Sequence, residues 1–233
     1  MTTPTYIARR GELEAYFDRT AAETWKRLTS DSPVGRVRAT VRAGREEMRR
    51  KLLSWLPEDL RGARLLDAGC GTGALSVEAA RRGAHVVAVD VSASLVAHAA
   101  ERLPRDLSGG HIEFIVGDLR DPTLGRFDYV VAMDSLIHYE GADIVGTLGS
   151  LAQRVSQGMV FTVAPRTPAL SAMHAVGQWF PRGNRSPAIA PVSRHALRRL
   201  FDAEEALRGW ALIRDHRVTK GFYISQAWEA RRS

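Results

Sequence analysis

The sequence predicts an α/β fold of Rossmann-like type, in which a mostly parallel sheet carries helices on both faces. Short apolar runs at residues 64–68 and 85–90 flank a stretch of good helix formers at residues 74–82. A glycine-rich turn at residues 69–73 joins the first run to that stretch. This order of elements is typical of a parallel sheet with crossover helices. At 233 residues, the chain is long enough for one large domain with a small appendage.

The glycine-rich turn predicts a nucleotide-binding site. Gly69, Gly71 and Gly73 lie at alternate positions, so the backbone can take positive φ and approach a ligand at the N-terminus of the next helix. Cys70 is most simply a small residue within this turn. The second apolar run ends in Asp90, whose carboxylate at a strand tip can accept hydrogen bonds from both ribose hydroxyls of an adenosine.

Two nucleotide chemistries fit this turn. Gly69-x-Gly71-x-x-Ala74 also matches the dinucleotide fingerprint, so an NAD or FAD enzyme is a rival interpretation, as is a glycine turn without a ligand. Asp67, at the end of the first apolar run, is poorly placed beside a dianionic pyrophosphate. It suits a ligand that carries a cationic α-amino group.

The pattern D-x-G-x-G-x-G from residue 67, with Asp90 and then Gly117-Asp118 after a third apolar run, resembles motif I and its successors in class I S-adenosylmethionine-dependent methyltransferases. The resemblance implies S-adenosyl-L-methionine as methyl donor, a seven-stranded sheet, and Asp118 near the adenine amino group. The residues expected to contact the donor lie in the turn, at strand ends and in the N-terminal segment: Tyr16, Arg45, Asp67, Gly69, Cys70, Gly71, Gly73, Asp90, Val91, Ser92, Asp118, Leu119, Met133 and Asp134.

The loop at residues 134–139 is expected to border the methyl group. It follows a fourth apolar run at residues 127–133 and so reaches the carboxyl-terminal edge of the sheet, where ligands bind in open α/β sheets. The N/D-P-P-Y sequence of many amino-directed methyltransferases is absent from it. His138 can orient or deprotonate an oxygen nucleophile, or can be a structural donor to a backbone carbonyl. His138 and Tyr139 are the predicted catalytic residues.

The N-terminal region is predicted to be helical. Residues 11–29 read as one or two helices, and residues 34–56 as a longer one. The longer helix carries an apolar stripe and, about 100° away, an arginine stripe: Val37, Val41, Met48, Leu52 and Trp55, then Arg38, Arg42, Arg45 and Arg49. The arginines are either a solvated face or turn inward to bind carboxylates of the cofactor or of an acidic substrate. Arg45 is the preferred candidate for the inward role.

The segment at residues 165–192 is predicted to be a substrate lid inserted after a fifth strand at residues 159–164. It holds five of the ten prolines and an apolar surface that includes Trp179 and Phe180 in a helix at residues 169–180. Ser193 is expected to cap a helix that runs to residue 202, and an antiparallel hairpin at residues 210–216 and 221–228 completes the sheet. The predicted units are therefore a helical arm, a donor-binding core, the lid and the completion of the sheet: residues 1–57, 58–164, 165–192 and 193–233.

The composition of the chain limits its expected cellular location and binding partners. The formal net charge of +7 comes almost entirely from arginine, and no RNA-binding motif is legible, so no nucleic acid partner is expected, although an RNA methyltransferase stays an alternative. The single cysteine excludes a disulfide framework. No apolar run approaches the roughly 20 residues of a membrane span, and the first twenty residues are polar. A cytoplasmic protein is expected.

Several segments, taken together, resemble the magnesium-protoporphyrin IX O-methyltransferases. They are EAYFDRTAAETWKRL, VRATVRAGREEM, LLDAGCGTGALS, MDSLIHY, VAPRTP with WFPRG, and KGFYIS, and they span almost the whole chain. The resemblance implies methylation of one propionate of magnesium protoporphyrin IX to its monomethyl ester in chlorophyll or bacteriochlorophyll synthesis. Relatives often carry Tyr where this chain has Thr29, so a role of that Tyr would pass here to Tyr16 or Tyr139.

A carboxylate acceptor agrees with the residues at the site. A propionic acid has a pKa of about 4.3 and is already a nucleophile at neutral pH, so the enzyme has to position and desolvate it. We therefore expect His138 to orient this carboxylate or to remove a residual proton. Magnesium is expected only within the substrate, because no cluster of oxygen ligands is legible.

The resemblance also implies partners. The porphyrin-binding subunit of magnesium chelatase is the expected supplier of an insoluble substrate, and a peripheral contact with photosynthetic membranes is expected through the basic N-terminal helix and the apolar lid. Two other functions stay open. One is methylation of another small oxygen acceptor, such as a quinone precursor, and the other is a donor-binding regulatory or carrier protein without turnover.

Overall fold

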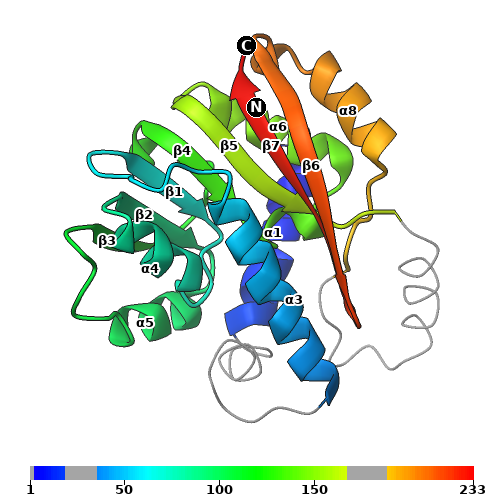
Figure 1. The fold of residues 1–233 in the computed structure, drawn as a ribbon. Helices are drawn as coiled ribbons and strands as arrows, with labels where there is room; N and C mark the ends of the chain where they lie inside the picture. The colour runs from blue at the N-terminus through cyan, green and yellow to red at the C-terminus, as the bar shows by residue number, and fades with distance from the viewer. Residues whose placement is uncertain (1–2, 19–35, 167–187) are drawn as a thin grey trace.

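The computed structural model describes residues 3–18, 36–166 and 188–233. Its centre is a seven-stranded sheet in the order β3-β2-β1-β4-β5-β7-β6 (Figure 1). The pairs from β3 to β5 are parallel, and β7 lies antiparallel between β5 and β6. The strands are β1 Arg64–Ala68, β2 His85–Asp90, β3 His111–Val116, β4 Phe127–Ala132, β5 Val155–Val163, β6 Trp210–Lys220 and β7 Tyr223–Arg232. This confirms the predicted mostly parallel Rossmann-like sheet of the class I methyltransferases.

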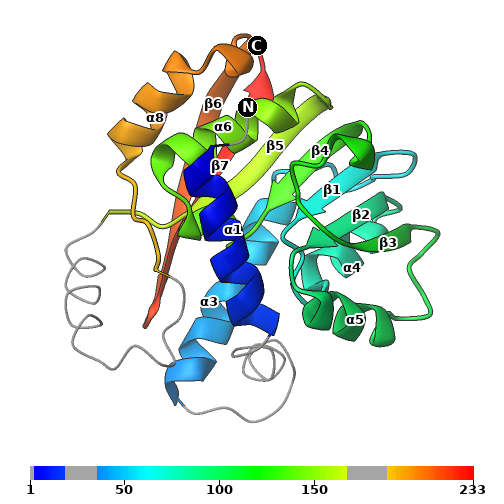
Figure 2. The same cartoon turned by 180° about the vertical axis from the view of Figure 1, so that it is seen from behind.

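Helices cover both faces of the sheet, as predicted. One face packs on α3 and α4, and the other on α1, α6 and α8, which lie in front when the molecule is turned (Figures 1 and 2). The helices are α1 Pro4–Tyr16, α3 Arg36–Leu53, α4 Ala74–Arg81, α5 Ala93–Glu101, α6 Gly141–Ala152 and α8 Arg194–Ala203. Ser193 caps α8 as expected, because its side chain accepts a hydrogen bond from the Ala196 N–H at 3.1 Å.

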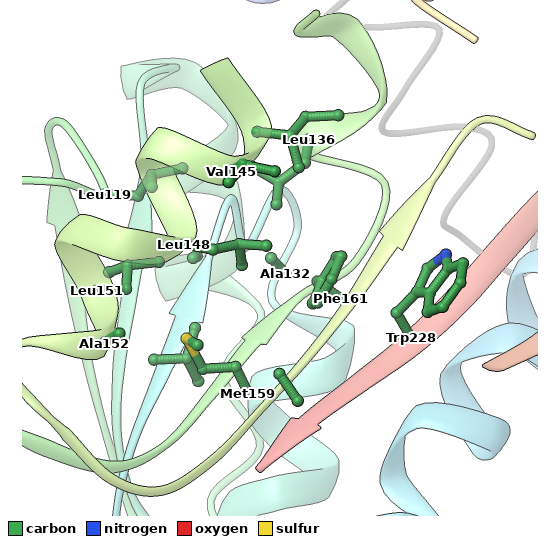
Figure 3. Packing of buried hydrophobic residues seen from close by; sticks show 14 of the residues in the cluster. Leu119, Ala132, Leu136, Val145, Leu148, Leu151, Ala152, Met159, Phe161 and Trp228 are labelled. Carbon is green, nitrogen blue, oxygen red and sulfur yellow. The ribbon is translucent and has the colours of Figure 1, made fainter. Parts of the chain in front are cut away.

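Alternate residues of each central strand divide the core into two clusters. Leu66 and Ala132 belong to the cluster under α6 and α8, whereas Leu65 and Val131 belong to the cluster under α3 and α4. Figure 3 shows the first cluster, in which leucines of α6 meet Phe161 and neighbouring side chains of the strands. Because both faces are buried, the strands appear in sequence as nearly continuous apolar runs.

The first helix begins earlier than predicted. We expected helix from residue 11, but α1 starts at Pro4. Thr3 is its N-cap, with its hydroxyl accepting from the Tyr6 N–H, and proline suits the first helical position because it lacks an N–H. The predicted continuation over residues 19–29 lies outside the described residues, as do Thr29 and the predicted lid helix with Trp179 and Phe180.

Element ends also shift where pairing overrides local pattern. The fifth strand was expected to start at residue 159, but β5 begins at Val155, which pairs with Phe127. The sixth strand was expected to end at residue 216, yet β6 continues to Lys220 because its polar end pairs with β7 up to Tyr223. The second change extends the final hairpin beyond the predicted length.

Candidate active site

A cavity of about 530 Å³ lies at the carboxyl-terminal edge of the central strands. The glycine turn after β1 forms one wall, and residues of α1, α3, the loop after β4 and the β6–β7 hairpin form the others. Its lining includes thirteen of the residues predicted for the site: Tyr16, Arg45, Asp67, Gly69, Cys70, Gly71, Asp90, Val91, Leu119, Met133, Asp134, His138 and Tyr139. Gly73, Ser92 and Asp118 are not among the lining residues.

The turn has the open backbone that the three glycines predicted. Gly69, Gly71 and Gly73 have φ values of 88°, 54° and 76°. A Cβ atom at Gly69 would lie 2.3 Å from the Cβ of Ser135, so the β1 turn and the β4 loop approach closely only with glycine there. Gly73 is instead the N-cap of α4. These contacts shape a cradle at a helix N-terminus, as a bound nucleotide requires.

Asp67 and Asp90 present carboxyl groups to this cradle. Asp67 is 1% exposed, and the Ser76 hydroxyl donates to it at 2.6 Å. Burial raises the pKa of Asp67 to about 7. Asp90 accepts the Gly71 N–H at 2.8 Å and the Ser92 N–H at 3.0 Å, and burial raises its pKa as well. The cradle therefore suits a ligand with an amino group and a ribose in shape and also in the carboxyl groups that it offers to them.

Ser92 and Asp118 hold the N-terminal segment against the core. The Ser92 hydroxyl caps α5 and donates to Asp18 at 2.7 Å. The Asp118 carboxylate accepts the Tyr6 hydroxyl at 2.7 Å and Arg10 at 3.0 Å. The structure thus places the Asp118 carboxylate against α1, beside the cavity-lining residues Tyr6 and Leu119, and its contact with the adenine stays a prediction.

Tyr6 lies between this anchor and the predicted catalytic loop. Its ring stacks on Tyr139 with centroids 4.9 Å apart, and both side chains are buried. Burial raises the pKa of each phenol, so neither is an effective base at neutral pH. The acid–base part of the catalytic prediction therefore rests on His138, and a role of Tyr139 in holding the substrate stays a prediction.

His138 is 6% exposed and lines the cavity. Its Nδ1 lies 3.3 Å from the carbonyl oxygen of Ala188, and a carbonyl can only accept, so Nδ1 carries the proton in this hydrogen bond. His138 therefore donates a structural hydrogen bond to a backbone carbonyl and also lines the cavity. In the neutral ring Nε2 is then an acceptor, and it becomes a donor only when the imidazole is protonated.

Arg45 turns inward as predicted, but its partner is a carboxylate of the chain. Its guanidinium lies 2.6 Å from Asp134, whose side chain is 4% exposed. The Tyr223 hydroxyl donates to the same carboxylate at 3.0 Å. Asp134 has φ of 55°, and its N–H donates to the Thr162 hydroxyl at 2.7 Å. Arg45 thus joins α3 to the loop after β4.

The other arginines of the predicted stripe differ in what the structure shows of them. Arg42 and Arg49 also line the cavity, and Arg49 pairs with Glu46, whereas the side chain of Arg38 lies outside the described part. Met48, Leu52 and Trp55 of the apolar stripe are buried under the sheet. The side of α3 that carries Arg42, Arg45 and Arg49 therefore borders the cavity, and binding of a cofactor or substrate carboxylate by these arginines stays a prediction.

The cavity also includes residues that the sequence did not single out. They come from α1 and its C-cap, the loop after β4 and the β6–β7 hairpin: Tyr6, Leu13, Phe17, Ser135, Phe222, Tyr223 and Ser225. The only signal for the last three was the KGFYIS segment. Cys70 has a pKa raised well above its usual value by burial, which agrees with a small turn residue rather than a nucleophile.

Comparison with known proteins assigns this arrangement to a family. A magnesium-protoporphyrin O-methyltransferase of Rhodobacter capsulatus is 52% identical over 97% of this chain and 98% of the relative. The chain belongs to the magnesium-protoporphyrin O-methyltransferase family. A family model for the C-terminus of magnesium-protoporphyrin IX methyltransferase matches residues 132–232, and a methyltransferase domain model matches residues 65–158.

Family members from other lineages match most of this chain in sequence and in fold. The chloroplastic magnesium protoporphyrin IX methyltransferase of Arabidopsis thaliana is 33% identical over 94% of this chain and 70% of the relative. A crystal structure of magnesium protoporphyrin IX methyltransferase from Synechocystis PCC 6803, with bound SAH, superimposes with a TM-score of 0.83 at 27% identity. The match covers 96% of this chain and 99% of that chain.

The structure also shows whether the described residues could bind a metal ion or span a membrane. The described residues contain no group of three or more His, Cys, Asp or Glu side chains placed to hold a metal ion. Among the helices of the described ranges, none is both long and apolar enough to cross a bilayer.

Proposed function

We propose that the chain transfers a methyl group from S-adenosyl-L-methionine to a propionate carboxylate of magnesium protoporphyrin IX, in chlorophyll or bacteriochlorophyll synthesis. Family membership over nearly the full length supports the reaction. The observation that carries the proposal at the level of residues is that one cavity includes both the glycine cradle with Asp67 and Asp90 and the loop with His138. A donor held by the first group faces an acceptor held by the second.

The cradle would hold the donor. The Asp90 carboxylate at the end of β2 would accept the ribose hydroxyls, and Asp67 would pair with the α-amino group. Gly69 and Gly71 let the backbone approach the donor, because a Cβ at Gly69 would meet Ser135. When bound, the donor supplies an electrophilic methyl group on a sulfonium sulfur.

His138 would hold the acceptor. The propionate, with a pKa of about 4.3, is ionised at neutral pH, so no protein base has to remove a proton. Because Nδ1 of His138 donates to Ala188, the ring can donate a second hydrogen bond to the carboxylate only from Nε2 of the imidazolium form. The charged ring would then fix one carboxylate oxygen toward the methyl group, and the apolar walls would strip its water.

The test incubates purified protein with S-adenosyl-L-methionine and magnesium protoporphyrin IX. The porphyrin products are separated by chromatography and identified by mass spectrometry. The expected product is the monomethyl ester, with one methyl group added per porphyrin. Binding of the donor without any ester, at several porphyrin concentrations, would contradict the proposal. A quinone precursor offered in place of the porphyrin serves as the control for acceptor class.

A partner and a surface contact complete the proposal. The substrate is poorly soluble in water. Direct delivery by the porphyrin-binding subunit of magnesium chelatase, near a photosynthetic membrane, would avoid its release into water. The net charge of +7 suits a peripheral contact with anionic lipids. Addition of that subunit should increase the rate of ester formation at limiting porphyrin, and an unchanged rate would argue against delivery.

A further inference from the structure

Phe222 stands out among the apolar residues because it is both exposed and part of the cavity. It is 57% exposed and lines the same cavity as His138. Single exposed apolar residues are common and need no explanation. An exposed aromatic ring at the mouth of a ligand cavity is different, because it offers a flat apolar surface to whatever extends out of that cavity.

The hairpin fixes Phe222 at this position. Lys220 pairs with Tyr223, so Gly221 and Phe222 form a two-residue turn at the hairpin tip. Gly221 has φ of 57°, as the first position of such a turn requires. Figure 1 shows the hairpin running past the rest of the sheet beside α3. The phenylalanine therefore lies at the tip of a paired element.

Two glycines bring this tip against α3. A Cβ at Gly44 would lie 2.5 Å from the Tyr223 ring, and a Cβ at Gly221 would lie 2.6 Å from the Thr40 hydroxyl. Tyr223 is 8% exposed, and its hydroxyl is bonded to Asp134. Because its neighbour is anchored in this way, the Phe222 ring is held at the cavity mouth with little freedom of the backbone.

The size of the cavity decides where a large acceptor must lie. About 530 Å³ is a pocket for one ligand of moderate size, and the donor needs much of it. A tetrapyrrole whose propionate reaches His138 therefore keeps most of its macrocycle at and beyond the mouth. The macrocycle is flat, conjugated and apolar, which is the chemistry that an aromatic ring stacks on.

We infer that Phe222 is a specificity-determining residue that binds the macrocycle of the porphyrin acceptor by stacking, on the wall formed by the hairpin tip and α3. The inference rests on the proposed function for the identity of the acceptor. It assigns no role in methyl transfer to Phe222, which acts only on acceptor affinity.

The test compares Phe222→Ala with Phe222→Trp and with Ile213→Ala. Ile213 is a matched control, because it lies in β6 of the same hairpin, is 53% exposed and does not line the cavity. Equilibrium binding of magnesium protoporphyrin IX is followed by porphyrin absorbance and by quenching of tryptophan fluorescence, and SAH binding by calorimetry. Steady-state kinetics give KM and kcat separately.

We expect Phe222→Ala to weaken porphyrin binding and raise the porphyrin KM by about five- to tenfold, a loss typical of one aromatic contact, with kcat and SAH affinity unchanged. Phe222→Trp and Ile213→Ala should bind the porphyrin like the wild type. Equal porphyrin affinity in Phe222→Ala and the wild type would overturn the inference. A wild type that binds porphyrin without making ester would instead overturn the proposed reaction, and the binding comparison would still decide the role of Phe222.

Discussion

At the scale of single residues, the site depends on how burial changes the charge of carboxyl groups. Asp67 accepts one hydroxyl hydrogen bond, is nearly inaccessible to water, and has its pKa raised to about 7 by that burial. It is therefore partly protonated at neutral pH in the absence of a cation. An ammonium group beside it would favour the ionised form.

This predicts a pH dependence of donor binding. Below about pH 7 Asp67 is protonated and cannot pair with the α-amino group, so affinity for S-adenosyl-L-methionine should fall as the pH is lowered from 7 to 6, by up to about tenfold per pH unit. Calorimetric titrations across this range measure it. In Asp67→Asn, whose side chain does not titrate, affinity should be lower and nearly constant with pH. A wild-type affinity independent of pH would contradict the pairing.

His138 gives a second prediction, which concerns turnover. Its orienting role needs the imidazolium form, because Nδ1 is committed to Ala188. His138→Ala should lower kcat by about 100-fold while SAH still binds. Full turnover in that variant would remove the residue from the mechanism.

At the scale of elements, an ion pair joins α3 to the loop after β4. Asp134 is nearly buried, in a backbone conformation with φ of 55°, and is satisfied by Arg45, Tyr223 and Ser225. Removal of the arginine leaves a buried carboxylate without its counter-charge. The pair therefore couples the arginine-bearing helix, the hairpin and the catalytic loop.

Arg45→Ala should lower the free energy of unfolding by about 3 kcal/mol, measured by urea denaturation. Arg50→Ala is the matched control on the same helix, because its side chain is 71% exposed, and it should change stability by about 0.5 kcal/mol or less. The double variant Arg45→Ala with Asp134→Asn should recover part of the loss, since asparagine carries no charge and tolerates positive φ. Equal losses in Arg45→Ala and Arg50→Ala would show that the pair has no such role.

Elements also show where the sequence was informative. The glycine turn and the carboxylate of Asp90 could be predicted, because strand ends and glycines carry local signals. The orientation of Asp118 could not, since its partners Tyr6 and Arg10 lie more than a hundred residues away in the chain. The Tyr223 hydrogen bond to Asp134 likewise joins residues 89 positions apart. Contacts between residues so far apart in the chain produce no local sequence pattern from which they could be predicted.

At the scale of the whole molecule, the cavity is built from segments spread over the chain. α1 supplies Tyr6 and Leu13, the central strands supply the cradle, and the final hairpin supplies Phe222 and Tyr223. Donor binding should therefore stabilise the fold globally. At a concentration 100 times Kd, SAH should add about 2.7 kcal/mol and raise Tm by several degrees. An unchanged Tm at saturating SAH would mean that the folded state does not bind it.

The central claim is that donor and acceptor share the cavity between the glycine turn and His138. A crystal structure of the protein with bound SAH tests it most directly. We predict the ligand over residues 69–73, its ribose hydroxyls within hydrogen-bond distance of Asp90 and its sulfur directed toward the loop with His138. SAH bound elsewhere, or lying in the cavity with its sulfur turned away from that loop, would contradict the account.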